Sequence, residues 1–232
     1  MMIKTKKING KYSAKLTYLS QLYQMASILL RRNVSILPSQ KKYNITISSE
    51  KKFLWFRVAK VGTRTILNVL KKSNVTLDAE HAYELHYPEV VYDDYFKFAM
   101  VRNPWDRLVS CWKNKVVRKN MFRFTDEKRD RMKEFKNFVE YVSTLDIKKC
   151  DQHIRLQSEL IDLNNVDYIG RFENFDKDLK YILNILDIEV TEIEKKNVSN
   201  CNKNYKEYYD DELRDKVAKI YSKDIMLLSY SF

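Results

Sequence analysis

Glycine, proline and cysteine are scarce in this chain of 232 residues, which contains three of each. So few glycines and prolines leave little room for flexible linkers or for turn-dense all-β folds, and they favour a helix-rich α/β architecture. Cys111, Cys150 and Cys201 are an odd number without C-x-x-C spacing. The sequence therefore supports neither a disulfide framework nor a zinc site, and it predicts a reducing compartment and no metal.

Long apolar runs are also missing. No stretch approaches the roughly 20 apolar residues that a helix needs to cross a bilayer. The basic start of the chain lacks the compact apolar core and the small-residue cleavage site of a signal peptide. These absences predict a cytoplasmic protein.

Acidic residues are almost absent from the first 60 positions, where Glu50 stands against thirteen lysines and arginines. The whole net charge of +12 therefore comes from this segment, because the rest of the chain holds equal numbers of basic and acidic residues. A neutral body argues against general nucleic-acid binding and for a local anion site.

The N-terminal segment contains one amphipathic stretch. Residues 16–30 place apolar side chains on one helical face: Leu16, Leu19, Leu22, Tyr23, Ala26, Leu29 and Leu30. This helix either packs on the folded domain or, through residues 1–35, touches an anionic membrane from one side. We expect residues 1–42 to form a basic extension and residues 43–232 to form the main domain.

Strand-like and helix-like patterns alternate along the main domain, which indicates a P-loop-like parallel sheet flanked by helices. Asn103 and Pro104 together form a helix start signal, as N-cap and first helical residue. Strands are expected at 43–47, 53–58, 95–101 and 166–172, and helices at 63–72, from 103 onward, at 134–145, 174–187 and 210–229.

The first motif, AKVGTRTI, follows the second strand-like run. Gly62 allows a tight turn, so that backbone amides and the positive end of the next helix can face an anion. The lysine precedes the glycine, unlike in the Walker pattern, which weakens a kinase interpretation. The expected phosphate-binding residues are Lys60, Val61, Gly62, Thr63, Arg64 and Thr65.

The second motif, VRNPWDRLVS, follows the strand expected at 95–101. Arg102 leaves the strand at the sheet edge where open α/β sheets bind ligands. Ser110 lies two helical turns further on, so a guanidinium and a hydroxyl can converge on one phosphate. Asp106 and Arg107 are expected to form structural ion pairs.

Together the two motifs resemble the carbohydrate-type sulfotransferases, sulfotransferase family 2. The stretch VDYIGRFENFDKDLKYILNILDI at 166–188 and the tail from residue 202 agree with the bacterial members. The resemblance implies a sulfotransferase fold. It also implies that 3'-phosphoadenosine 5'-phosphosulfate, PAPS, is the sulfuryl donor, that adenosine 3',5'-bisphosphate is the product, and that a carbohydrate hydroxyl is the acceptor.

The resemblance also implies roles for individual residues. Lys60 and its loop would bind the 5'-phosphosulfate, and Arg102 with Ser110 would bind the 3'-phosphate. Asn202 and Lys203 would close over the nucleotide. The acceptor needs a base, and His81 and His86 lie in the region where related enzymes place one; Glu80, Glu84 and Glu89 stand behind them, and His153 is interpreted as structural or acceptor-facing.

Two other functions remain open at this stage. One is a nucleotide-dependent phosphotransferase with a degenerate phosphate loop, which the missing Walker order and the lack of an evident magnesium carboxylate disfavour. The other is a non-catalytic module that binds anions or membranes through the basic N-terminus.

Overall fold

The computed structural model describes residues 38–39, 41–190 and 204–232. The helix expected at 16–30 and the residues Asn202 and Lys203 lie outside these ranges. The strands are β1 Tyr43–Ser48, β2 Phe53–Phe56, β3 Ala79–Leu85, β4 Phe96–Val101 and β5 Tyr168–Arg171. The α-helices are α2 Thr63–Lys72, α3 Pro104–Trp112, α4 Asp126–Met132, α5 Phe135–Ser143, α6 Phe175–Ile185, α7 Asp211–Ile220 and α8 Ser222–Leu227.

The five strands form one sheet in the order β3-β1-β2-β4-β5. β2, β4 and β5 are parallel, as expected for continuous apolar runs that are buried on both faces. β1 and β3 run antiparallel to their neighbours, so the sheet is mixed. The carboxyl ends of β2 and β4 therefore share one edge with the end of β3, and the residues that follow these three strands leave the sheet on the same side.

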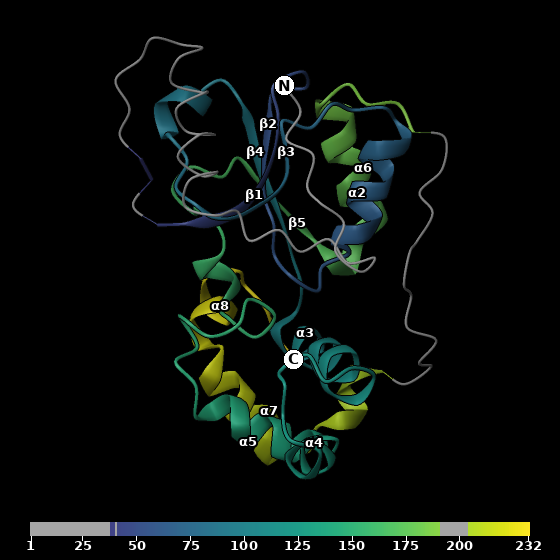
Figure 1. Ribbon diagram of the computed structural model, residues 1–232, viewed down its shortest axis with the longest axis vertical. Helices are drawn as coiled ribbons and strands as arrows, with labels where there is room; N and C mark the ends of the chain where they lie inside the picture. Colours follow the sequence, from purple (N-terminus) through teal and green to yellow (C-terminus); the bar gives the residue numbers. More distant parts are fainter. Residues whose placement is uncertain (1–37, 40, 191–203) are drawn as a thin grey trace.

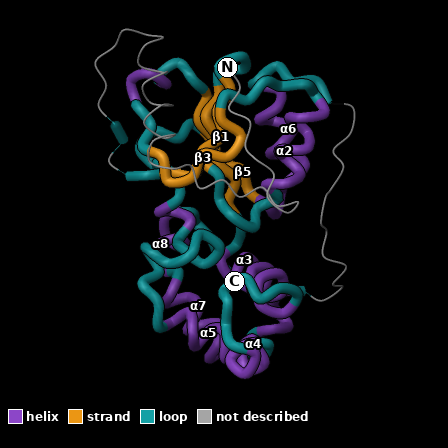
Figure 2. The backbone as a smooth tube through the Cα atoms, viewed as in Figure 1, coloured by secondary structure: helices purple, strands orange, loops and turns teal. Residues whose placement is uncertain are grey.

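The described residues form two hydrophobic cores. The first lies around the sheet, where α2 and α6 cover one face (Figure 1). The second joins α3, α5 and α7 in a helical layer beyond the carboxyl edge of the sheet (Figure 2). The connection from β4 into α3 passes directly from one core to the other, which places residues 102 and 103 at the junction.

Local sequence signals set the helix boundaries. α2 spans the predicted residues 63–72. The Asn103 side chain accepts hydrogen bonds from the Trp105 and Asp106 amides, and Pro104 is the first helical residue, which confirms the predicted start of α3. The helix expected at 210–229 is interrupted at Tyr221, where the buried ring sends its hydroxyl to the Ile154 carbonyl at 2.8 Å.

Candidate active site

The loop between β2 and α2 turns on two residues with left-handed backbone angles. Lys60 has φ 76° and Gly62, the N-cap of α2, has φ 82°. The helical hydrogen bonds of α2 begin with the Thr65 and Ile66 amides, which donate to the Gly62 carbonyl at 2.8 and 3.2 Å. The earlier amides therefore belong to the open N-terminus of the helix, which is the part of a helix that binds anions.

α6 fixes the shape of this loop. A Cβ atom at Gly62 would lie 2.4 Å from the Phe175 ring, at the first residue of α6. Only glycine fits this close approach, and its positive φ adds a second reason. The Phe175 ring therefore packs against the loop at Gly62. Because Phe175 belongs to the sheet core, the loop conformation depends on that core.

Lys60 is a partly buried cation surrounded by other cations. Burial, together with the charges of Arg102, Lys115 and Arg64, lowers the pKa of its ammonium to about 8. Within the described residues, no carboxylate forms an ion pair with this ammonium. A cation that has only other cations as charged neighbours is stabilised by a bound anion.

Arg102 lies next to Lys60. Its guanidinium donates to the Lys60 carbonyl at 3.1 Å, holds both oxygens of Asp106 at 2.9 and 2.8 Å, and stacks on the Phe172 ring at 4.1 Å. The buried Gln157 side chain bonds the amide and the carbonyl of Arg102 at 3.0 and 2.8 Å. The ion pair expected for Asp106 is thus present, and Arg102 is fixed at both backbone and side chain.

Among the described residues, no carboxylate forms the ion pair that the sequence context of Arg107 suggested. Its side chain is buried, at 1% exposure, and it donates three hydrogen bonds to backbone carbonyls. These are Ala59 at 3.0 Å, Gln152 at 2.8 Å and Arg155 at 2.9 Å. The guanidinium therefore ties the lysine loop of the sheet core to a turn of the helical core.

The remaining predicted donor residues differ in what they can offer. Val61 is fully buried and has only its backbone to contribute. The Thr63 hydroxyl donates to the Val58 carbonyl at 3.1 Å, Thr65 is buried at 3% exposure, and Arg64 is exposed. Ser110 is partly exposed on α3, two turns beyond Arg102.

The two histidines predicted as bases lie on or just after β3, a strand that the sequence did not reveal. His86 donates from Nδ1 to the Ser39 carbonyl at 2.7 Å, which leaves its Nε2 lone pair available. His81 is buried and accepts from the Arg57 guanidinium at Nδ1. Burial, followed by the charge of Arg57, lowers the pKa of His81 to about 3. This geometry favours His86 over His81 as a proton acceptor.

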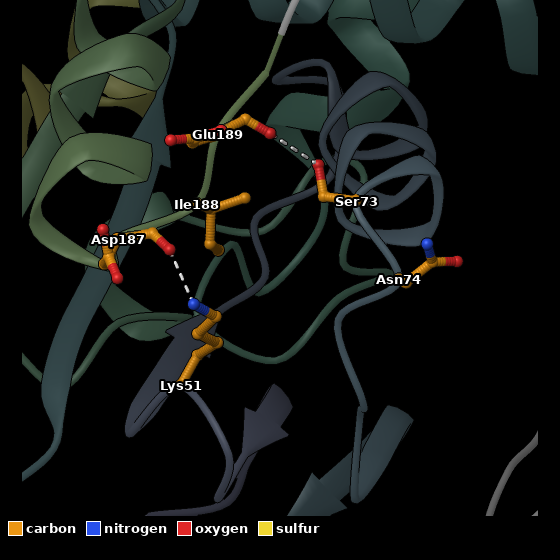
Figure 3. Close-up of a pocket in the computed structure, with 6 residues that line it drawn as sticks. All are labelled: Lys51, Ser73, Asn74, Asp187, Ile188 and Glu189. Carbon is orange, nitrogen blue, oxygen red and sulfur yellow. Dashed lines mark hydrogen bonds between the residues drawn. The ribbon is translucent and has the colours of Figure 1, made fainter.

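A cavity of about 340 Å³ lies at the opposite edge of the sheet, where β2 begins and α2 and α6 end. Figure 3 shows the Lys51 ammonium bonded to the Asp187 carbonyl and the Ser73 hydroxyl bonded to the Glu189 carbonyl. These hydrogen bonds join the chain to itself. The converging cations lie at the other edge, so we place the site there and not in this cavity.

A comparison with known families agrees with this geometry. A sequence profile described as the sulfotransferase family matches residues 43–231. The chain belongs to the sulfotransferase family. The resemblance of the two motifs is thereby confirmed, and the Lys60 loop lies in a domain that transfers sulfuryl groups. No curated protein and no solved structure matches this sulfotransferase.

In the part of the chain that the structure describes, no helix is long and apolar enough to cross a membrane.

Sequence reasoning missed two basic residues of this sulfotransferase that lie near the loop. Arg107 is part of the quoted motif, but its carbonyl partners lie 45 and 48 residues away along the chain. Lys115 is buried in a π-helical turn, Lys113–Val117, that continues α3. The signal for Lys115 was its helical face, because it follows Cys111 by four residues and Trp112 by three, and therefore lies on the apolar side of the helix.

The lowered pKa of Lys60 gives the sulfotransferase an expected alkaline limit. Only the ammonium form carries the positive charge that attracts an anionic ligand, and in the free enzyme half of this form is lost at a pH of about 8. We expect kcat/KM to fall about tenfold per pH unit above that value, while kcat falls at higher pH because a bound anion raises the lysine pKa. Initial rates measured from pH 6 to 10 check this, and a flat kcat/KM up to pH 9.5 would contradict it.

Proposed function

We propose that this sulfotransferase transfers the sulfuryl group of PAPS to a hydroxyl of a carbohydrate. The observation that carries the proposal is the hydrogen bond from Arg102 to the Lys60 carbonyl, which joins two cationic motifs at the open N-terminus of α2. One phosphate can lie against the loop while a second lies against Arg102. PAPS carries such a pair, a 5'-phosphosulfate and a 3'-phosphate, on one nucleoside.

Each group in this site has a role in the proposed reaction. Lys60 and the loop amides neutralise the charge that develops on the oxygen between sulfur and the 5'-phosphate. Arg102 and Ser110 bind the 3'-phosphate, and Asp106 holds the guanidinium in position for it. The acceptor proton goes to a histidine base, for which the sequence predicted His86 or His81 at the end of the sheet.

Further parts of the proposal concern residues outside the described ranges. Asn202 and Lys203 would cover the bound nucleotide, and residues 1–35 would make any peripheral contact with an anionic membrane.

The expected setting is the cytoplasm, without a nucleic-acid partner and without a metal. The acceptor would enter between the segments 73–94 and 117–160, which flank the two motifs.

Adenosine 3',5'-bisphosphate is expected to raise the melting temperature of the protein without magnesium, because a ligand that binds only the folded state stabilises it. A saturating excess of about 100 times Kd corresponds to about 2.7 kcal/mol. The measurement is a thermal melt with and without the nucleotide. A melting temperature that responds only to ATP with magnesium would instead support the phosphotransferase alternative.

A further inference from the structure

The turn that carries His153 lies against the lysine loop. The Arg107 guanidinium donates both to the Ala59 carbonyl, directly before Lys60, and to the Gln152 carbonyl, directly before His153. The Gln152 side chain also accepts a hydrogen bond from Asn44 in β1 at 2.8 Å. Two segments that are about 90 positions apart in the sequence are therefore fixed side by side at the junction of the two cores.

Asp151 orients the imidazole of His153. The backbone amide and Nδ1 of His153 both bond Oδ1 of Asp151, at 2.9 and 2.7 Å. In the neutral ring, this arrangement places the proton on Nδ1 and leaves the Nε2 lone pair for another partner. A carboxylate that holds one ring nitrogen while the other nitrogen faces a substrate is the arrangement of a histidine general base.

The charges around His153 connect it to the cationic site. The charged groups that face its imidazole are Asp151 in the same turn, Lys60 in the loop and Lys115 in the π-helical turn after α3. Burial lowers the pKa of His153, the two lysines lower it further, and Asp151 opposes them. The ring is therefore a neutral proton acceptor at physiological pH, and its side chain still reaches solvent at 18% exposure.

The sheet order separates the other histidines from Lys60. Lys60 follows β2, whereas His81 lies in β3 and His86 directly after it, and β1 lies between the two strands. Two strand spacings amount to about 10 Å. In addition, Arg57 occupies Nδ1 of His81. The turn with His153 is not separated from the Lys60 loop in this way, because Arg107 bonds both segments directly.

We propose that His153, positioned by Asp151, is the general base that takes the proton of the acceptor hydroxyl. The proposal rests on the proposed sulfuryl transfer. The acceptor proton passes to Nε2 of His153 while the acceptor oxygen forms its bond to sulfur. The bond from sulfur to the 5'-phosphate oxygen breaks and leaves its electron pair on that oxygen. The resulting imidazolium is stabilised by Asp151 and then releases its proton to solvent.

The first test compares His153→Gln, His86→Gln and His81→Gln in the full chain. Labelled-sulfate transfer from PAPS is measured to dextran, chitosan and alginate oligosaccharides, and to water alone so that one assay requires no particular glycan. We expect His153→Gln to lower kcat by about 10²–10³-fold, and His86→Gln and His81→Gln to lower it less than tenfold. Lys149→Gln, an exposed change in the same segment, serves as the matched control and should leave kcat unchanged.

The second test measures the pH–rate profile, because a base and a structural residue affect it differently. The rate falls on the acid side of the profile, the acid limb, when the base becomes protonated. Asp151→Asn removes the charge that raises the pKa of His153, so the limb should move to lower pH. Lys115→Met removes a charge that lowers this pKa, so the limb should move to higher pH. These shifts also carry the test if His153→Gln fails to fold.

Three results would overturn the assignment. One is a His153→Gln variant whose kcat stays within tenfold of wild type. Another is a larger loss of kcat in His86→Gln or His81→Gln than in His153→Gln, and the third is an acid limb that neither Asp151→Asn nor Lys115→Met moves. A wild-type protein that shows neither transfer nor a melting shift with adenosine 3',5'-bisphosphate would instead refute the proposed function, and the base assignment with it.

Discussion

Replacing Lys60 with methionine is expected to lower kcat for sulfuryl transfer by about 10²–10³-fold, the usual effect of removing one preorganised donor from a developing oxyanion. Methionine keeps the length of the side chain and meets the same backbone strain as lysine at φ 76°. The Kd for adenosine 3',5'-bisphosphate should rise less than tenfold, because Arg102 and the loop amides remain. Single-turnover rates and nucleotide titrations measure the two effects separately.

Lys71→Met is the matched control for this change. Lys71 is exposed in the last turn of the same helix, at the end of α2 far from the loop. It should leave both kcat and nucleotide affinity at the wild-type level. A Lys60→Met variant that binds the nucleotide more weakly but keeps the wild-type kcat would assign the lysine to ground-state binding and contradict a role in the transition state.

Replacing Arg107 with methionine is expected to lower the free energy of unfolding by about 3–5 kcal/mol, because three backbone carbonyls in the interior lose their donors. The same change should weaken nucleotide binding, since the Ala59 carbonyl no longer anchors the loop. Urea denaturation gives the free energy of unfolding. Titration with adenosine 3',5'-bisphosphate at urea concentrations below the unfolding transition gives the nucleotide affinity.

The comparison for this variant is Arg118→Met. Arg118 is exposed, and its loss should change the free energy of unfolding by less than about 0.5 kcal/mol. Arg107→Lys keeps the charge, but an ammonium cannot donate to all three carbonyls as the planar guanidinium does. Its free energy of unfolding should therefore lie between those of wild type and Arg107→Met. A stability of Arg107→Met within about 1 kcal/mol of wild type would show that water or rearranged backbone replaces the three hydrogen bonds.

The parts of the fold that depend on neighbouring residues could be predicted from the sequence. The apolar runs predicted β2 and β4, and the sequence signals predicted both ends of α2 and the start of α3 at Asn103 and Pro104. β3 was missed because its sequence, AEHAYEL, carries charged residues that suit an edge strand and give no apolar run.

The candidate site shows the same division. Lys60 and Arg102 could be found because each lies in the short turn between an apolar strand and a helix. The short spacing of Asp151 and His153 is visible in the sequence, but their nearness to Lys60 is not, because it depends on the hydrogen bonds of Arg107 to Ala59 and Gln152. Such contacts between distant segments are set by the packing of the two cores and have no local signature.

The two halves of the candidate site are anchored in different hydrophobic cores. The Lys60 loop is anchored by Val58 and Val61 in the sheet core, while the turn with His153 is anchored by Ile154 and Leu156 in the helical core. Substitutions that reshape the helical layer can therefore alter the approach of an acceptor without disturbing the donor loop. Arg107 connects the loop to the turn, and its three hydrogen bonds limit how far these two segments can move relative to each other.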